Sequence, residues 1–241
     1  MSGEKGVKIQ PDQEELELVF RLLYERFGPR HWWPAGSPFE VVIGAILTQG
    51  VAWRNVEKAI ENLKKNGLLN PQGLKEVEVG RLESLIRPSG YFRVKARKLK
   101  AFVEYLWANY AGDLDLMFAE PWEKLRSELL SIFGIGPETA DAILLYAGHK
   151  PVFVVDAYTK RVFARLGYLD EKIGYHDLQC FFTSVLPQDV GLFNEFHAQI
   201  DHLANTICRK REPRCSECPL RGICAHVEAV SESDERSQVA P

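Results

Sequence analysis

The sequence lacks any apolar run that approaches the ~20 residues of a membrane-spanning helix. It also lacks a convincing alternation of apolar and polar residues, an internal repeat and a long linker. Residues 151–156 (PVFVVD) are rich in valine, but they are too few to build a sheet. The first ten residues, MSGEKGVKIQ, are polar and contain no apolar segment of the secretory kind. These absences predict an all-α, cytoplasmic protein with no membrane partner.

Cysteine is scarce except near one end of the chain. Four of the five cysteines, Cys208, Cys215, Cys218 and Cys224, follow the spacing C-x6-C-x2-C-x5-C. Four thiolates so close along the chain are typical of an iron–sulfur cluster or a zinc site rather than of two disulfides. On spacing alone both metal centres stay open. Cys180 lies in the apolar segment QCFFTSVL, which predicts an inert core thiol.

The formal net charge of −3 argues weakly against a nucleic-acid binder, but the charge is unevenly distributed. The last fifteen residues contain four acids and one arginine and have little apolar content, which predicts a disordered tail. Two basic clusters remain, either as solvated surfaces or as phosphate-binding surfaces, and we favour the second. They contain Arg93, Lys95, Arg97, Lys98 and Lys100, and then Arg209, Lys210, Arg211, Arg214 and Arg221.

Helical patterns cover nearly the whole chain. Asp12 with Glu15 three residues later predicts a capping box for a helix that ends at Gly28. Ser37 and Pro38 predict the start of a second helix, FEVVIGAILTQ. Further helices are expected at about 53–66, 79–87, 93–110, 122–132, 137–147, 157–166, 176–185 and 190–207.

Residues 122–148 predict two helices joined by a tight turn. The first helix ends at Phe133, Gly134 and Gly136 form the turn, and Pro137 opens the second helix, where its missing N–H has no cost. Glycines leave backbone amides exposed beside a helix N-terminus, and such a site attracts an anion such as phosphate. A bare G-x-G is also found in ordinary helical hairpins. The residues around it therefore have to distinguish a phosphate-binding hairpin from an ordinary one.

The segment F-G-I-G-P-E-T-A, followed by an apolar helix and VVDAYTKRV, resembles the helix–hairpin–helix and Gly/Pro-Asp signature of the HhH-GPD superfamily of DNA glycosylases. The cysteine spacing is similar to that of the endonuclease III-like members, in which it holds a 4Fe–4S cluster. The resemblance covers roughly residues 15–226. It implies that the hairpin, with Gly134, Gly136 and Thr139, binds a DNA phosphate, often through a monovalent cation, Na⁺ or K⁺.

The same resemblance implies an architecture. Residues 39–149 are expected to form a six-helix barrel that ends in the hairpin. Residues 1–38 and 150–226 are expected to form a second helical lobe with the iron–sulfur cluster, and 227–241 a disordered acidic tail. The two lobes would flank a DNA-binding cleft, with double-stranded DNA containing a damaged base as the partner of a monomeric, nucleoid-associated enzyme.

Asp156 occupies the aspartate position of the signature, so the resemblance implies that it is catalytic. A carboxylate can stabilise the positive charge that develops on the sugar when an N-glycosidic bond breaks, and it can orient water. Its structural alternative is helix N-capping, and the two roles are compatible. Members that also cleave the strand have a lysine where this chain has Glu138, which cannot form a Schiff base. We therefore expect a monofunctional glycosylase with weak or absent AP-lyase activity.

Aromatic residues predict the base pocket. The order W-W-P, then L-T-Q with an aromatic four residues after the glutamine, resembles the 3-methyladenine DNA glycosylase III branch, which implies a pocket of Trp32, Trp33, Pro34 and Trp53. An electron-rich aromatic box favours a positively charged alkylated base. The alternative is that the tryptophans belong to the core. That branch lacks the cysteine cluster, so the substrate could instead be an oxidised pyrimidine or a mismatched adenine, uracil or thymine.

Other residues are expected to touch the DNA. In endonuclease III-like enzymes a glutamine at the position of Gln49 enters the gap left by the flipped base. The segment SGYFRVKA resembles the family's second DNA-contacting turn, in which an aromatic residue can wedge the base stack. This implies DNA contacts by Tyr91, Phe92, Arg93 and Lys95. A non-catalytic DNA-binding protein with the same hairpin remains a separate alternative.

Overall fold

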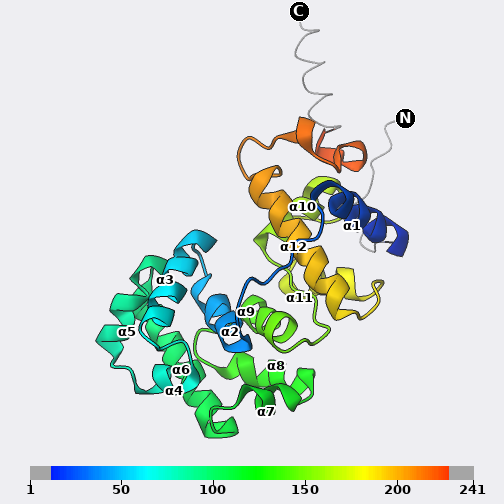
Figure 1. The fold of residues 1–241 in the computed structure, drawn as a ribbon. Coiled ribbons are helices and arrows are strands. Elements are labelled where there is room, and N and C mark those ends of the chain that lie inside the picture. The colour runs from blue at the N-terminus through cyan, green and yellow to red at the C-terminus, as the bar shows by residue number, and fades with distance from the viewer. Residues whose placement is uncertain (1–11, 228–241) are drawn as a thin grey trace, which may run out of the picture. The chain divides into compact units, whose positions relative to one another are not determined.

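In the computed structural model, residues 12–227 are described (Figure 1). Apart from Val227, the acidic tail expected over 227–241 lies outside these residues. The described part contains helices and no strand, so the all-α prediction is confirmed. Within it no helix has the length and apolar character that a membrane crossing requires.

The chain divides into two compact units, each of which is described by itself. Unit 2 comprises Trp33–Val152, and unit 1 joins the chain up to Trp32 with the chain from Phe153 onward. The sequence placed these divisions at 39 and 149. Both units are built from helices that bury one another's apolar faces, as seen in the core residues of each.

Unit 2 is organised around one buried helix, α2 (Pro38–Leu47), in which every residue from Phe39 to Leu47 is buried. A helix that is apolar on all sides has to be surrounded, and α2 contacts α3, α6, α9 and η2. Ser37 caps α2 as predicted. The other elements are α3 (Trp53–Lys65), α4 (Pro71–Glu76), α5 (Val79–Leu85), η1 (Arg87–Ser89), α6 (Phe92–Tyr110), α7 (Leu114–Ala119), α8 (Trp122–Ser131), α9 (Pro137–Ala142) and the π-helical turn η2 (Ile143–Ala147).

Unit 1 packs its first two α-helices against its last α-helix. Asp12 and Glu15 form the predicted capping box, and α1 and α10 both contact α12. Stacked and perpendicular phenylalanine rings fill the core beneath them. The elements are α1 (Gln13–Phe27), α10 (Ala157–Leu166), α11 (Tyr175–Thr183), α12 (Val190–Thr206), η3 (Cys215–Glu217) and η4 (Arg221–Ile223).

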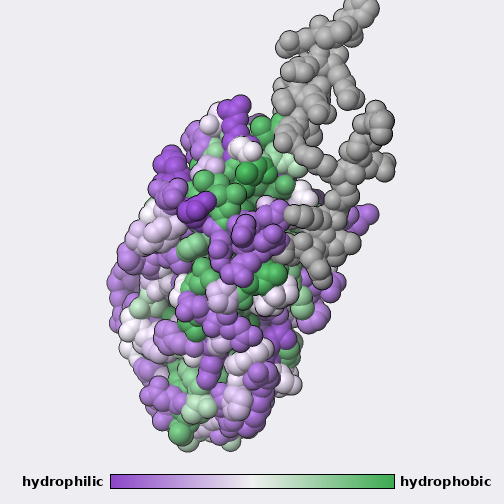
Figure 2. All heavy atoms as spheres, turned by 90° about the vertical axis from the view of Figure 1, so that its right-hand side faces the viewer, coloured by the Kyte–Doolittle hydropathy of each residue, from purple (hydrophilic) through white to green (hydrophobic). Residues whose placement is uncertain are grey.

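Two short helices, α4 and α7, and the exposure of Cys180 differ from what the sequence predicted. Asn70 and Asp113 cap helices of six residues each, too short to show a periodic pattern. Cys180 is exposed, with its sulfur 3.6 Å from His176 Nε2, because its side of α11 faces away from the apolar residues beside it. Figure 2 shows one face of the molecule, on which hydrophilic residues predominate and hydrophobic residues form smaller patches.

Candidate functional site

Asp156 is the N-cap of α10 and is held by the first turn of that helix. Its Oδ1 accepts hydrogen bonds from the Thr159 backbone N–H at 2.7 Å and from the Thr159 hydroxyl at 2.8 Å. Thr159 is itself buried. One carboxylate oxygen is therefore fixed by capping, and the other, Oδ2, is left to face a different group.

That other group is His197 on α12. Its Nε2 lies 3.8 Å from Asp156 Oδ2, an ion-pair distance that is too long for a hydrogen bond. The side chains of Asp156 and His197 are 13% and 12% exposed. Burial raises the pKa of Asp156, but His197 and the two Thr159 donors outweigh it, so the pKa is below its ordinary value. The site therefore holds an ionised carboxylate in a nearly dry place.

Neither Lys160 nor Glu138 offers a free amine beside Asp156. Lys160 lies one helical turn beyond Asp156, but its amine donates to the Ile173 carbonyl at 2.6 Å. Glu138 lies in the first turn of α9 and is exposed. A carboxylate there is favoured by the positive end of the helix dipole.

The hairpin has the predicted order of helix, glycine turn and helix, but the first helix ends at Ser131 rather than at Phe133, and the second changes to a π-helical turn at Ile143. Helix α8 ends before Gly134, whose φ of +80° lies in the left-handed region, and Gly136 is the N-cap of α9 with Pro137 after it. The Ala140 N–H makes the first helical bond, to Gly136 O, so the amides before it have no partner within the helix. Arg126 and the fully buried Asp141 join α8 to α9 through two hydrogen bonds of 2.6 and 3.0 Å.

Gln49 connects the end of α2 to this hairpin. Its amide nitrogen donates to Thr139 Oγ1 at 2.9 Å and to Gly134 O at 3.2 Å. Its amide oxygen accepts from the Lys98 amine on α6. The stem of Lys98 covers Gly134, because a Cβ at that glycine would lie 2.5 Å from it. Thr139, expected at the DNA surface, is buried beneath these contacts.

Three aromatic rings of unit 2 meet beside α2. Trp33 contacts Trp53 with ring centres 5.1 Å apart and ring planes at 86°, and it contacts Tyr146 at 5.4 Å. A Cβ on Gly44 would lie 3.0 Å from the Trp33 indole, so this glycine allows the ring to pack on α2. Both tryptophans are half-buried, whereas Tyr146 is buried. Pro34 is exposed, and Trp32 is the last residue of the unit 1 segment.

The turn before α6 presents one large aromatic side chain to solvent. Tyr91 has a φ of +44° and is 78% exposed. Phe92 is half-buried, with the guanidinium groups of Arg87 and Arg93 each 5.8 Å from its ring centre. Tyr91 is therefore the better placed of the two rings to touch a partner, and Arg93 is exposed next to it.

Lys95 does not fit the expected role at the DNA surface. It is 2% exposed, and its amine donates to Leu47 O at 2.7 Å and to Ser89 O at 2.6 Å. Burial, with a smaller contribution from Lys98, lowers its pKa to about 8. Lys95 therefore binds the ends of two helical segments inside unit 2, because its position on α6 faces the core.

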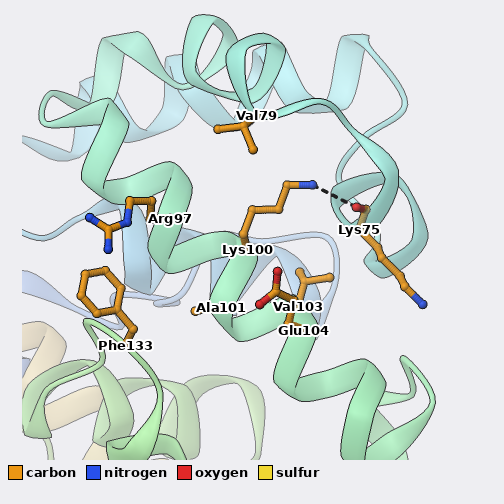
Figure 3. A pocket seen from close by; sticks show the side chains of 8 residues that line it. All are labelled: Lys75, Val79, Arg97, Lys100, Ala101, Val103, Glu104 and Phe133. Carbon is orange, nitrogen blue, oxygen red and sulfur yellow. Dashed lines mark hydrogen bonds between the residues drawn. The ribbon is translucent and has the colours of Figure 1, made fainter.

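Further along α6 the surface has a hollow of about 600 Å³. Figure 3 shows the Phe133 ring beside Arg97, whose guanidinium lies 4.7 Å from the ring centre. Lys100 is not available for a ligand, since its amine donates to the carbonyls of Leu74, Lys75 and Val77 at 2.6–2.9 Å. The basic cluster on α6 therefore splits into residues that bind backbone and residues that remain at the surface.

The four clustered cysteines, Cys208 to Cys224, lie in a loop of unit 1 that is fastened to α10. Arg165 donates to Cys208 Sγ at 3.3 Å and to Arg209 O at 2.7 Å, and Arg161 donates to Cys208 O at 3.0 Å. Burial raises the pKa of Cys218 to about 11, with the three other thiols acting in the same direction.

The donor set of this loop fits a metal centre. Backbone amides of Leu220 point at Cys218, and those of His226 and Val227 point at Cys224, and such N–H···S bonds are typical of bound thiolates. Over residues 12–227 no three His, Cys, Asp or Glu side chains are grouped as ligands of a single metal ion. In a 4Fe–4S cluster each of the four thiolates binds a different iron, whereas a zinc site gathers them around one ion.

Comparison with known proteins establishes the family. Residues 43–188 match the HhH-GPD superfamily base excision DNA repair protein family. The chain belongs to this superfamily. A protein of Methanocaldococcus jannaschii, provisionally named DNA repair glycosylase, is 43% identical over 88% of this chain and 96% of its own. Endonuclease III of Sulfolobus acidocaldarius is 31% identical over 78% of this chain and 82% of its own.

Solved structures agree with this assignment. The H. pylori 3-methyladenine DNA glycosylase (MagIII) bound to 1,N6-ethenoadenine has a TM-score of 0.70 and 29% identity, covering 81% of this chain and 98% of that one. An endonuclease III–DNA covalent intermediate has a TM-score of 0.80 over 92% and 100% of the two chains, and at 22% identity it shows the fold alone. The HhH-GPD chain is thus a DNA glycosylase for base excision repair, with DNA as its partner.

The sequence did not single out His197 and Thr159 beside Asp156 in unit 1, or Tyr146 beside the tryptophans of unit 2. His197 is distant from Asp156 along the chain and reaches it only through the packing of α12 on α10. Thr159 could have been identified, because an N-cap side chain bonds the N–H two or three residues later. Tyr146 lies within the apolar helix after the hairpin, where an aromatic residue is expected in the core and its contact with Trp33 cannot be predicted from the sequence.

Proposed function

We propose that this HhH-GPD protein is a monofunctional glycosylase that removes an alkylated purine, of the 3-methyladenine type, from duplex DNA. The observation that carries the choice of base is the aromatic group of Trp33, Trp53 and Tyr146. Two half-buried rings at 86° to each other provide one face for stacking and one edge for packing. Such faces favour a base with positive charge, and an alkylated adenine is such a base. Pro34 would add to this pocket within unit 2, and Trp32, next to Trp33 along the chain, would contact the base from the unit 1 segment.

The carboxylate of Asp156 would act on the sugar. It is ionised and nearly buried, so its interaction with developing positive charge is weakly screened. Water is the nucleophile in this proposal, since Glu138 replaces the amine that a Schiff base needs and Lys160 is bonded to Ile173 O. An alkylated purine is already an activated leaving group, so little acid catalysis is required.

DNA contacts are proposed for the hairpin and for the turn before α6. Gly134 and Gly136 would present amides to a phosphate, directly or through Na⁺ or K⁺. Tyr91, at 78% exposure, would wedge the base stack, and Phe92 would support it from below. Gln49 would fill the gap left by the extruded base, and Arg93 would bind phosphate.

We also propose that Cys208, Cys215, Cys218 and Cys224 hold a 4Fe–4S cluster with a structural role. The amides that point at two of these sulfurs and the guanidinium of Arg165 at a third would stabilise thiolates. When bound, the cluster would fix the basic loop 209–214, which this chain fastens to α10 through Arg161 and Arg165.

A panel of duplexes with one lesion each tests the substrate and the absence of lyase activity. The panel contains 1,N6-ethenoadenine, an oxidised pyrimidine, and G·T, G·U and A·G mismatches, with methylated DNA assayed for released 3-methyladenine. We expect release of 3-methyladenine, the positively charged base, ahead of the neutral 1,N6-ethenoadenine, and strand breaks only after alkali. Breaks without alkali, or a borohydride-trapped covalent adduct, would show a bifunctional enzyme.

An Asp156→Asn variant tests the catalytic carboxylate. Asparagine is as good an N-cap as aspartate, so α10 should keep its start. We expect excision to fall by at least ~100-fold, a typical contribution of a positioned catalytic group, with DNA affinity retained. Unchanged excision would favour a non-catalytic role for this residue.

A further inference from the structure

Asp156 belongs to a half-buried cluster of charged side chains in unit 1. Asp201 follows His197 by one turn of α12, and both His197 and Asp156 act on its charge. Two carboxylates in a poorly solvated place repel each other, and both ionise only if positive charge lies between them. Among the ion pairs of residues 12–227, the partner of Asp156 is His197, whose ring carries a positive charge when it is protonated.

The environments of the two carboxylates drive their pKa values apart. Burial raises the pKa of Asp201, and His197 and Arg30 do not reverse this. The pKa of Asp156 moves the other way, because His197 and Thr159 overcome its burial. Such a divergence separates a carboxyl group that stays charged from one that takes up a proton first.

Arg30 does not replace His197 in this arrangement. Its guanidinium lies 3.1 Å from His202 Nδ1, and its backbone N–H donates to Glu195 at 2.9 Å. His202 lies on α12 like His197, but its partner is Arg30 and not Asp156. The titratable or charged side chains that the packed elements of unit 1 direct at this cluster are Asp156, Tyr158 and Arg161 from α10, His197 and Asp201 from α12, and Arg30 after α1.

We propose that His197 is a positioning residue of this enzyme, whose protonated ring keeps Asp156 ionised and aims its Oδ2. The ring does not touch the substrate. It supplies the positive charge that allows a carboxylate to stay charged in a nearly dry site, while Thr159 fixes the other oxygen. The activity measurement below rests on the proposed catalytic role of Asp156. The NMR titration does not depend on that role.

The test compares His197→Gln and His197→Asn with His202→Gln, a matched change on the same helix. Carboxyl-carbon NMR follows the titration of Asp156, assigned with the Asp156→Asn variant and measured without DNA. In the wild type the Asp156 midpoint should lie below the ordinary value of about 3.9. Both His197 variants should raise it by about one pH unit or more, a tenfold change in proton affinity, and His202→Gln should leave it unchanged.

Release of 3-methyladenine from methylated DNA, corrected for spontaneous loss and followed from about pH 3.5 to pH 8, gives the second measurement. The acid limb of the His197 variants should move upward with the NMR midpoint, while His202→Gln follows the wild type. An unmoved Asp156 midpoint overturns the proposal. If the midpoint moves and the excision profile does not, His197 controls Asp156 but the catalytic role of Asp156 fails. Ring-nitrogen NMR of the wild type needs no variant, and a neutral His197 ring at pH 6 overturns the proposal.

Discussion

At the scale of single residues, the positive charge of Lys95 suggested a DNA contact, and the structure shows instead a buried side chain. Its side chain looks like part of a phosphate-binding cluster in the sequence, yet its amine satisfies the carbonyls at the ends of α2 and η1. A buried ammonium that binds two backbone carbonyls stabilises their positions, but it pays for lost hydration. The balance between these two effects should be visible in the pH dependence of stability.

We expect the free energy of unfolding to rise with pH through the window set by Lys95. Burial lowers its pKa from 10.5 to about 8 in the folded protein. Between these values the unfolded state binds the extra proton, so stability increases with pH from about 8 to 10.5. Urea unfolding of the wild type and of Lys95→Met should differ by an amount that grows in favour of the wild type over this window. A constant difference would contradict the lowered pKa.

At the scale of elements, the hairpin depends on the ion pair between α8 and α9. Asp141 is fully buried, and Arg126 binds both of its carboxylate oxygens. Arg126→Met leaves that charge without its main counter-ion, and we expect a loss of about 3 kcal/mol in unfolding free energy. Lys124→Met on the same helix is the control, because the Lys124 pair is exposed and should be worth less than about 1 kcal/mol. Equal losses of unfolding free energy in the two variants would show that the buried pair stabilises the protein no more than the exposed pair does.

Capping residues and periodic apolar patterns in the sequence predicted most of the helices. Helices too short to show such a pattern were not predicted. Asp12 and Ser37 are caps with apolar helices behind them, so both helix starts follow from the sequence. The six-residue helices α4 and α7 have caps but no room for a repeating apolar pattern. The catalytic candidate Asp156 was found through its motif. Its neighbour His197 was not, because only the packing of α12 on α10 brings them together.

At the scale of the whole molecule, the cysteine loop and the candidate carboxylate share one helix. Asp156 caps the start of α10, and Arg161 and Arg165 further along bind the backbone and one thiol of the loop. The loop makes few buried apolar contacts of its own, and short segments of this kind need a metal centre or a similar cross-link for order. Loss of the centre should therefore loosen the loop before it affects α10.

Removal of one thiol tests this arrangement. We expect Cys218→Ser to lose the brown colour, the iron and the acid-labile sulfide of the purified protein, because a 4Fe–4S cluster needs four thiolates. Its loop 208–224 should exchange amide hydrogens faster, while the α10 amides stay protected. Cys180→Ser, a change at the exposed fifth cysteine, should keep colour and iron. A colourless wild type that contains zinc would identify the centre as a zinc site, and fast exchange in α10 as well as in the loop would show that the helix depends on the cluster for its own stability.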